Sequence, residues 1–435
     1  MYKKIKKIFW RQSPARLISL GFLLVILIGS FLLMLPISIR DGTTVSYIDA
    51  LFTSTSAVCV TGLIAIDTAD HFTTFGRIVV GLLIQIGGLG VTAIGAGIIL
   101  ATGKRLSMKG TLLVKEAMNV SNFKGLKKLV KSVFFVTLCF EVVGMVLSFT
   151  VFVRDYPPFE ALGISLFHSV AAFNNSGFDI LGGLRNLIPY QNSIILNLTT
   201  CGLIFFGGLG FFVILDIWKN WSFRKLCLHS KVVVVTSLFL IIIGTLGIKF
   251  TEPISWLGAF FHSVSARTAG FSTYPIGNFT SASLFIIIIL MFIGASPGST
   301  GGGIKTSTFF VMMNAIKGVA TNQHCSSFHR KIPLDVIYRA FIITILSFIV
   351  VCSSTFLLCV LEPEYSFLQL LFESTSAFGT VGLSTGITPE LGVLSKMVII
   401  ITMYIGRLGA LTIVTMWTFK PSALAEYTEE QISIG

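Results

Sequence analysis

Four tripeptides of the chain end in glycine and could bind a cation through main-chain oxygens. Glycine permits backbone conformations that turn successive carbonyl groups toward one axis, where they can replace the hydration shell of an ion. One such tripeptide is a weak signal because the pattern is common, but four in similar surroundings predict a selectivity filter for a monovalent cation. The four filter triplets are Val60-Thr61-Gly62, Asn175-Ser176-Gly177, Thr268-Ala269-Gly270 and Thr380-Val381-Gly382.

Each filter triplet lies near the end of a longer stretch that occurs four times, at a spacing of roughly a hundred residues. The stretches are residues 52–63, 167–178, 261–271 and 372–383, and each opens with Phe, followed by Ser two residues later and Ala five residues later. They lie between long apolar segments but are too short to cross about 30 Å of hydrocarbon. A segment that enters and leaves on one side must hide its irregular backbone in protein or a water-filled cavity. We therefore expect a re-entrant half-helix followed by an extended loop.

The composition places the whole chain in a membrane. Hydrophobic residues make up 54% and charged residues 12% of the sequence, and the mean hydropathy is +0.87. Basic residues cluster at the N-terminus and in the links between repeats, whereas the other connections carry acidic residues, which is the positive-inside pattern. Both termini are thus expected in the cytoplasm, and the net charge of +13 does not indicate nucleic-acid binding. The seven scattered cysteines predict neither disulfides nor a metal site.

These features predict an all-α integral membrane protein, in which four tandem span–pore-loop–span repeats surround a central pore. It would contain eight transmembrane helices and four re-entrant half-helices. The expected divisions are a cytoplasmic N-terminus (1–16), repeats 1 to 4 (17–101, 129–218, 232–318 and 335–418) and a cytoplasmic tail (419–435). The second spans share a glycine motif at residues 86–90, 206–210 and 405–409, and small residues there favour close helix contact.

The second span of the third repeat departs from that motif, because proline and clustered glycines must interrupt its helix. The segment from 294 to 305 is therefore expected to form an intramembrane loop that breaks the helix. A phosphate-binding loop is the competing interpretation, but Ile304 separates Gly303 from Lys305 and no strand precedes the segment. The loop residues of interest are Gly294, Ala295, Ser296, Pro297, Gly298, Ser299, Thr300, Gly301, Gly302, Gly303 and Lys305.

Arg407 stands where Gly88 and Gly208 stand in other repeats. An arginine in a span costs about 2.5 to 3.5 kcal/mol on insertion scales, so it should pair with a carboxylate or face the pore. The sequence leaves open whether Arg407 pairs with Glu141 or is a fixed positive charge below the filter.

Several polar residues of the repeated stretches have structural or functional interpretations. The position directly after the opening Phe, here called the shared slot, is occupied by His168, His262 and Glu373 in the second, third and fourth stretches. We expect these side chains to cap or pack rather than to bind metal. Asn174 and Asn175 either shape the second loop or contact the ion path. Arg267 is expected to brace the third loop through backbone carbonyls.

These motifs together resemble the membrane subunits of the Trk/Ktr/HKT potassium transporters, most closely the short, eight-span Ktr type (KtrB-like). The resemblance covers nearly the whole chain and includes the four glycine stretches, the broken third span and the Gly-Arg-Leu-Gly segment at 406–409. It implies a potassium-selective filter, and a gate formed by the intramembrane loop and Arg407. It also implies a homodimer in the lipid of a bacterial cell membrane, on a cytosolic ring of RCK-type nucleotide-binding subunits (KtrA-like).

Potassium would be the transported substrate, with no cofactor in this chain, and a requirement for sodium stays open. A sodium-selective or weakly selective transporter of the same fold is the main alternative. A carrier built on inverted repeats is disfavoured because all four repeats begin on the cytoplasmic side. The HExxH motif and the paired intramembrane carboxylates that would suggest a membrane enzyme are missing from the sequence.

Overall fold

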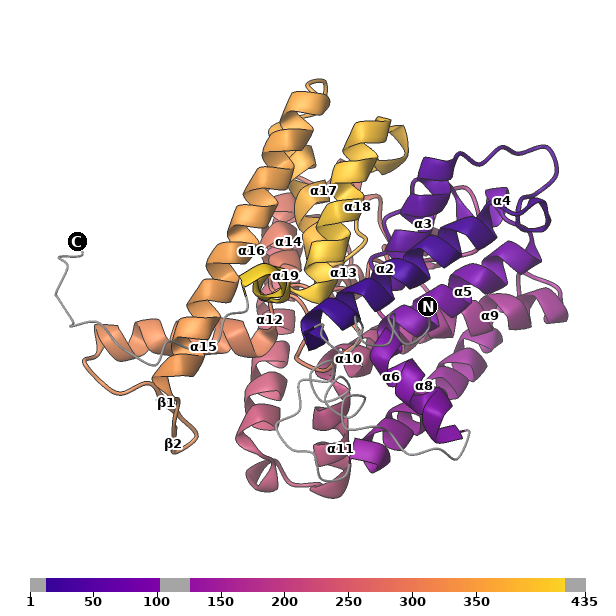
Figure 1. The fold of residues 1–435 in the computed structure, drawn as a ribbon. Helices are drawn as coiled ribbons and strands as arrows, with labels where there is room; N and C mark the ends of the chain where they lie inside the picture. The colour runs from indigo at the N-terminus through magenta and orange to yellow at the C-terminus, as the bar shows by residue number, and fades with distance from the viewer. Residues whose placement is uncertain (1–12, 102–125, 419–435) are drawn as a thin grey trace, which may run out of the picture.

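The computed structural model describes residues 13–101 and 126–418, and its helices repeat in the same order four times (Figure 1). Each repeat has a long first helix, a half-helix and a second span split into two parts. In the first repeat they are α2 (Pro14–Leu33), α3 (Tyr47–Cys59), α5 (Thr74–Leu89) and α6 (Val91–Ala101), and in the second α8 (Leu126–Phe152), α9 (Pro158–Phe173), α10 (Ile194–Leu209) and α11 (Phe211–Lys219). In the third repeat they are α12 (Leu228–Thr251), α13 (Trp256–Ser265), α14 (Ser281–Phe292) and α15 (Thr306–Ala320), and in the fourth α16 (Leu334–Leu361), α17 (Phe367–Gly379), α18 (Val393–Leu408) and α19 (Ala410–Thr418).

Short elements complete the connections. They are α4 (Thr68–His71), the 3-10 turns η1 (Pro36–Ser38), η2 (Ile188–Tyr190), η3 (Phe223–Lys225), η4 (Ile276–Asn278) and η5 (Thr388–Glu390), and the strands β1 (Ser326–Ser327) and β2 (Arg330–Lys331). The strands pair antiparallel, with Ser326 opposite Lys331. In Figure 1 this hairpin and α11 lie at the opposite end of the molecule from α4. The expected all-α fold is confirmed.

Four helices of the described residues are long and apolar enough to cross a membrane, and they are the first helices α2, α8, α12 and α16. Large apolar side chains such as Phe31, Phe135 and Phe348 are exposed on them. A surface of this kind suits contact with lipid rather than water. The bent pair of α10 and α11 would count as a fifth span.

Capping residues in the sequence set the ends of the half-helices. Ser46, Ser255 and Ser366 accept backbone N–H bonds as the N-caps of α3, α13 and α17, and Pro158 is the first residue of α9. The helices α3 and α17 end at residues in the left-handed conformation. The phenylalanine that opens each repeated stretch is buried, so it anchors its half-helix in the core.

Packing of the half-helices closes the four repeats into a ring. Each half-helix packs against the first helix of its own repeat and against the second span of the preceding repeat. The pairs across repeats are α3 with α18, α9 with α5, α13 with α10 and α17 with α14. Since the first repeat contacts the fourth in the same way as the others contact their neighbours, the molecule has pseudo-fourfold order.

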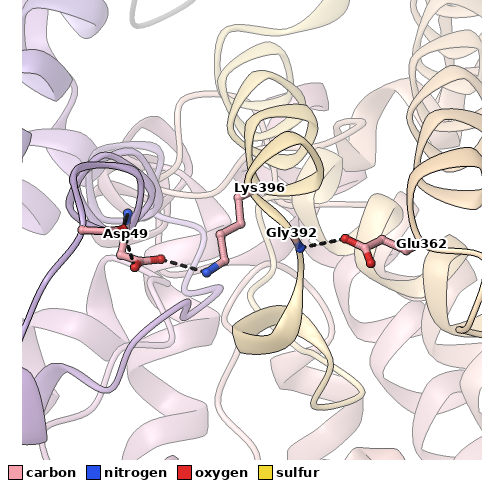
Figure 2. A network of polar contacts seen from close by, with 5 residues as sticks. Asp49, Glu362, Gly392 and Lys396 are labelled. Atoms are coloured by element: carbon pink, nitrogen blue, oxygen red, sulfur yellow. Dashed lines mark hydrogen bonds and ion pairs between the residues drawn. The ribbon is translucent and has the colours of Figure 1, made fainter.

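Polar contacts join the last repeat to the first and also join helices within a repeat (Figure 2). The ammonium group of Lys396 on α18 lies 2.8 Å from the carboxylate of Asp49 on α3, which joins the last repeat to the first. Glu362, at the end of α16, accepts a 2.7 Å bond from the backbone N–H of Gly392, the N-cap of α18. In the third repeat Glu252 accepts a 2.6 Å bond from Thr280, the N-cap of α14, in the same manner.

All four second spans are interrupted, which corrects the expectation of a break in the third alone. The breaks of the first, second and fourth repeats are at Gly90, Gly210 and Gly409, whose φ angles are 85°, 92° and 88°. These are left-handed values that favour glycine. The chain turns by 97° between α10 and α11. The repeated glycine motif therefore ends a helix besides packing closely.

Candidate ion pathway

The four filter triplets meet in one ring of main-chain contacts. The glycine of each triplet faces a carbonyl oxygen in the triplet of the next repeat, that of the residue just before the glycine there. The two are so close that a Cβ added to the glycine could not fit. An ideal Cβ would lie 2.1 Å from Ser176 O at Gly62, 2.8 Å from Ala269 O at Gly177, 2.3 Å from Val381 O at Gly270 and 2.1 Å from Thr61 O at Gly382. The order of contacts runs through repeats 1, 2, 3 and 4 and returns to 1. Loops distant in sequence thus converge around one axis.

The backbone conformation is the same in all four triplets. The first residue of each has a positive φ: 57° at Val60, 59° at Asn175, 74° at Thr268 and 48° at Thr380. The glycines have φ values between 68° and 91°. A non-glycine residue in this region is strained and persists only where its surroundings impose it. Left-handed residues at alternate positions let successive carbonyl groups turn to one side, as a filter requires.

Serine hydroxyls of the half-helices hold three of the loops. Ser56 Oγ donates to Leu63 O at 2.8 Å and accepts from Gly62 N at 3.0 Å. Ser376 accepts from Gly382 N at 3.1 Å, and Ser265 donates to Phe271 O at 2.5 Å. In the second repeat alanine stands at this place, and the Ser176 hydroxyl donates back to Ala171 O at 3.2 Å. Each loop is therefore tied to the helix that precedes it.

A second set of serines, whose role was not predicted from the sequence, ties each half-helix to the first helix of its repeat. Their hydroxyls donate to main-chain oxygens: Ser54 to Ile26 at 2.7 Å, Ser169 to Glu141 at 2.6 Å, Ser263 to Ile241 at 2.8 Å and Ser374 to Val351 at 3.2 Å. The signal was present, because each repeated stretch has Ser two residues after its first Phe. These bonds fix the depth of the half-helices.

The slot shared by His168, His262 and Glu373 is used for packing and bracing. His168 Nε2 lies 2.9 Å from Thr200 Oγ1, and His262 is buried among aromatic rings. Glu373 accepts from Ser384 Oγ, Thr385 N and Thr388 Oγ1 at 2.7 to 2.9 Å, which holds the loop after the fourth triplet. Among the described residues no group of three or more His, Cys, Asp or Glu side chains could hold a metal ion.

Two further polar residues join neighbouring repeats or helices. The Asn175 side-chain amide lies 3.2 Å from Thr268 Oγ1, so it links the second triplet to the third. This contact favours a shaping role for Asn175. Arg267 donates at 3.2 Å to the carbonyl and hydroxyl of Ser237. It therefore braces against a backbone carbonyl, as expected, but that carbonyl belongs to α12 and not to the loop.

The intramembrane loop crosses directly beneath the filter ring. Gly302 N donates to Thr380 Oγ1 at 3.0 Å, and an ideal Cβ on Gly301 would lie 2.2 Å from Thr268 Oγ1. The loop therefore contacts the first residues of the third and fourth filter triplets.

The other side of the loop rests on the second repeat. Ser296 N donates to Gly208 O at 3.0 Å, and Thr300 Oγ1 donates to Gly207 O at 3.1 Å. Phe211 N, at the start of α11, donates to Gly298 O at 3.1 Å. The two ends of the loop are joined by a parallel bridge between Ile293 and Ile304. No strand precedes the glycines among the described residues, which argues against the phosphate-binding interpretation.

Arg407 is bound to the intramembrane loop. Its guanidinium group donates to Thr300 O in the loop and to Gly87 O at the end of α5. The alternative pairing with Glu141 is wrong, because Glu141 instead accepts from the Asn174 side-chain amide. Lys305 donates to Gly301 O at 2.8 Å within the loop. Arg407 therefore connects the fourth repeat, the loop and the first repeat.

A cavity of about 620 Å³ lies against the loop. Three basic side chains line it, namely Lys305, Arg339 and Arg407, together with Gly88, Pro297, Gly298, Ser299, Gly301 and Gly303. The loop residues contact the filter triplets on one side and this cavity on the other. An ion leaving the filter toward the cavity would have to pass the loop and Arg407.

Comparison with known proteins agrees with this arrangement. A family model described as a cation transport protein (TrkH) matches residues 15–251 and 226–426. The chain belongs to the TrkH family of cation transport proteins. Membership makes it a membrane transporter of cations and not an enzyme.

Relatives of this TrkH-family chain match it over its whole length. It is 37% identical over 448 residues to the Ktr system potassium uptake protein B of Bacillus subtilis, covering 100% of this chain and 99% of that protein. It is 36% identical over 455 residues to the potassium/sodium uptake protein NtpJ of Enterococcus hirae, with the same coverage. The crystal structure of the potassium transporter TrkH from Vibrio parahaemolyticus has the same fold, with a TM-score of 0.69 over 92% of this chain and 84% of that chain, at 18% identity.

Proposed function

We propose that this protein carries potassium ions across a membrane through the ring of four glycine triplets. The observation that carries the proposal is the closed series of contacts in which each triplet glycine faces a carbonyl oxygen of the next triplet. The names of the relatives, which describe potassium uptake proteins, support potassium as the ion. The half-helices direct their C-terminal ends, which carry partial negative charge, toward the filter loops and so favour a cation there.

The intramembrane loop and Arg407 form the gate in this proposal. The loop lies between the filter and the cavity, and it is held there by hydrogen bonds to the second and fourth repeats. A fixed positive charge at Arg407 raises the energy of a cation that approaches the loop. Release of the loop would open a path to the cavity, so the hydrogen bonds of the loop set the resting state.

The resemblance supports a homodimer that sits on a cytosolic ring of RCK-type nucleotide-binding subunits. One relative is named protein B of a Ktr system, which describes one component among others. The basic links between repeats favour a cytoplasmic location for both termini. Light scattering of the purified protein, alone and with a candidate cytosolic subunit, would measure both assemblies.

A sodium-conducting transporter is the second candidate, because another relative is named a potassium/sodium uptake protein. Uptake of potassium, rubidium and sodium should be measured in a potassium-uptake-deficient bacterial strain that expresses this chain with its cytosolic partner. We expect potassium and rubidium to enter in preference to sodium. Preferential sodium entry would replace the proposed substrate, and entry of no ion would argue against a pore.

A further inference from the structure

An ionisable side chain lies in the middle of a membrane-spanning helix without a cationic partner. Glu141 on α8 is buried, with 8% of its surface exposed. Within the described part of the chain it takes part in no ion pair. A carboxylate in hydrocarbon is costly, and an intramembrane acid therefore needs a partner, a bound cation or a proton.

The hydrogen bonds around Glu141 leave one acceptor of the cluster unpaired. The Asn174 amide nitrogen lies 3.2 Å from Glu141 Oε1, 2.8 Å from Gln85 Oε1 and 2.9 Å from Val170 O. An amide nitrogen carries two hydrogens and so cannot satisfy three acceptors, but the Gln85 side-chain amide, which also carries two hydrogens, is a further hydrogen-bond partner of Glu141. The Asn174 side-chain oxygen is buried and has no hydrogen-bond partner. A proton on the carboxyl group of Glu141 would add a donor to a cluster in which this oxygen is unpaired.

No charged group on the neighbouring helices takes the place of that proton. The helices α6, α9 and α10 pack against α8, and Gln85 belongs to α5. The ionisable residues of these helices are bonded elsewhere or lie apart from the cluster: His168 contacts Thr200, Arg77 donates to Ala69 O, Glu160 is exposed at the start of α9, and Cys201 is a thiol on α10. On α8 itself, Lys128 and Lys131 lie near its start, and Cys139 is exposed.

The cluster adjoins the ion pathway at one point. An ideal Cβ on Gly88 would lie only 1.9 Å from Asn174 Oδ1, and Gly88 lines the cavity below the filter. Asn174 also directly precedes the second filter triplet, while Arg407 donates to Gly87 O beside Gly88. Glu141 thus contacts the cavity wall through Asn174. A negative charge on Glu141 would oppose the positive charge of Arg407.

We propose that Glu141, with Gln85 and Asn174, forms a proton-binding site that controls the rate of ion passage. The inference rests on the proposed transport function. With the proton bound, the cluster is neutral and the positive charge of Arg407 is unopposed. When the proton leaves to water, the carboxylate attracts cations into the cavity and uptake becomes faster. A sodium ion is disfavoured as the ligand, because the amide hydrogens of Asn174 point toward the same oxygens.

Rubidium flux into liposomes should be measured over a range of pH, with equal pH on both sides, for wild type and Glu141→Gln. We expect wild-type flux to rise roughly threefold or more toward alkaline pH, and the glutamine variant to stay at the low rate throughout. Glu160→Gln, at an exposed position on α9, is the matched control and should keep the wild-type profile. A Glu141→Gln pH profile that superimposes on the wild-type profile would overturn the proposal. The proposal would also be overturned if Glu141→Gln kept the pH dependence of the flux but lost a dependence of the flux on sodium.

Infrared spectroscopy tests proton binding without any flux. Wild type should show a protonated-carboxyl C=O band that disappears at alkaline pH and is missing from Glu141→Gln. An unchanged band in Glu141→Gln would refute the site. If wild type moved no rubidium at any pH, the transport function would fail, and the infrared band would still decide whether Glu141 binds a proton.

Discussion

Gly62 in the first repeat faces the carbonyl oxygen of Ser176 in the second, and a Cβ added to Gly62 would lie 2.1 Å from that oxygen. This distance is shorter than any contact that a real Cβ makes, so either the side chain or the neighbouring loop has to move. The same relationship recurs at the other three triplets. The size of the ring therefore depends on glycine at four positions at once.

Gly62→Ser is expected to reduce the preference for potassium over sodium. The serine Cβ would push the Ser176 carbonyl away from its place and widen one side of the ring, which weakens the match to a dehydrated potassium ion. We expect the ratio of rubidium to sodium uptake to fall about tenfold, which corresponds to roughly 1.4 kcal/mol of lost discrimination. Competition uptake assays in the potassium-uptake-deficient strain would measure this ratio.

Gly386→Ser is the matched control for that variant. Gly386 also has a positive φ, 101° against 90° at Gly62, but nothing lies within 4 Å of its added Cβ. Both substitutions therefore introduce backbone strain, and only Gly62→Ser introduces a clash with another filter loop. The prediction fails if the two variants have the same ion preference.

A second prediction concerns two glycines of the same helix. On α10, a Cβ at Gly207 would lie 2.0 Å from Phe173 O at the end of the second half-helix, whereas a Cβ at Gly202 has open space. We expect Gly207→Ala to destabilise the protein by about 1 to 3 kcal/mol through overpacking. Gly202→Ala should stabilise it by up to about 1 kcal/mol through helix propensity. Thermal unfolding in detergent would compare them, and equal melting temperatures would contradict the packing argument.

The sequence was sufficient to predict four half-helices followed by loops because four signals coincide in each: a phenylalanine, a serine, a short length and a glycine. It was insufficient to predict the breaks at Gly90, Gly210 and Gly409. Glycine in a membrane helix is compatible with close packing as well as with a break, and only the third repeat has a proline to decide between them. The structure shows both roles within one motif, with Gly207 packed on a half-helix and Gly210 ending α10.

The partners of Arg407 could not be predicted for a different reason. The sequence left open whether Arg407 pairs with Glu141, which lies well inside another span, or is a fixed positive charge below the filter. The observed partners are main-chain oxygens 107 and 320 residues away, at Thr300 and Gly87. Carbonyl groups become free acceptors only where helices are broken, so their position depends on tertiary structure. The contacts of Arg407 depend on the break after α5 and on the intramembrane loop.

Arg407→Ala is expected to raise the rate of rubidium uptake. The substitution removes a positive charge from the cavity wall and two hydrogen bonds, one of which holds the intramembrane loop. At an effective dielectric constant of about 20, a unit charge several ångströms from the ion path raises the electrostatic energy of a passing cation by roughly 1 to 2 kcal/mol. We therefore expect an increase of about tenfold in initial uptake rates at matched expression.

Arg407→Lys separates the charge from the double hydrogen bond. Lysine keeps the positive charge, but its single nitrogen does not reproduce the planar fork that reaches Thr300 O and Gly87 O together. If the charge sets the barrier, the lysine variant should stay within about threefold of the wild-type rate. Uptake by Arg407→Ala that matches wild type would exclude Arg407 from the gate.

Deletion of residues 298–303 should give uptake that is faster and less dependent on the cytosolic partner. The deletion removes the Thr300 and Gly302 contacts that hold the intramembrane loop beneath the filter. The bridge between Ile293 and Ile304 shows that the chain segments on either side already lie together, so a shortened connection can rejoin them. Rubidium uptake should be compared with and without the partner, after size-exclusion chromatography has established that the variant is folded. Slower uptake by a folded variant would show that the loop supports conduction and does not obstruct it.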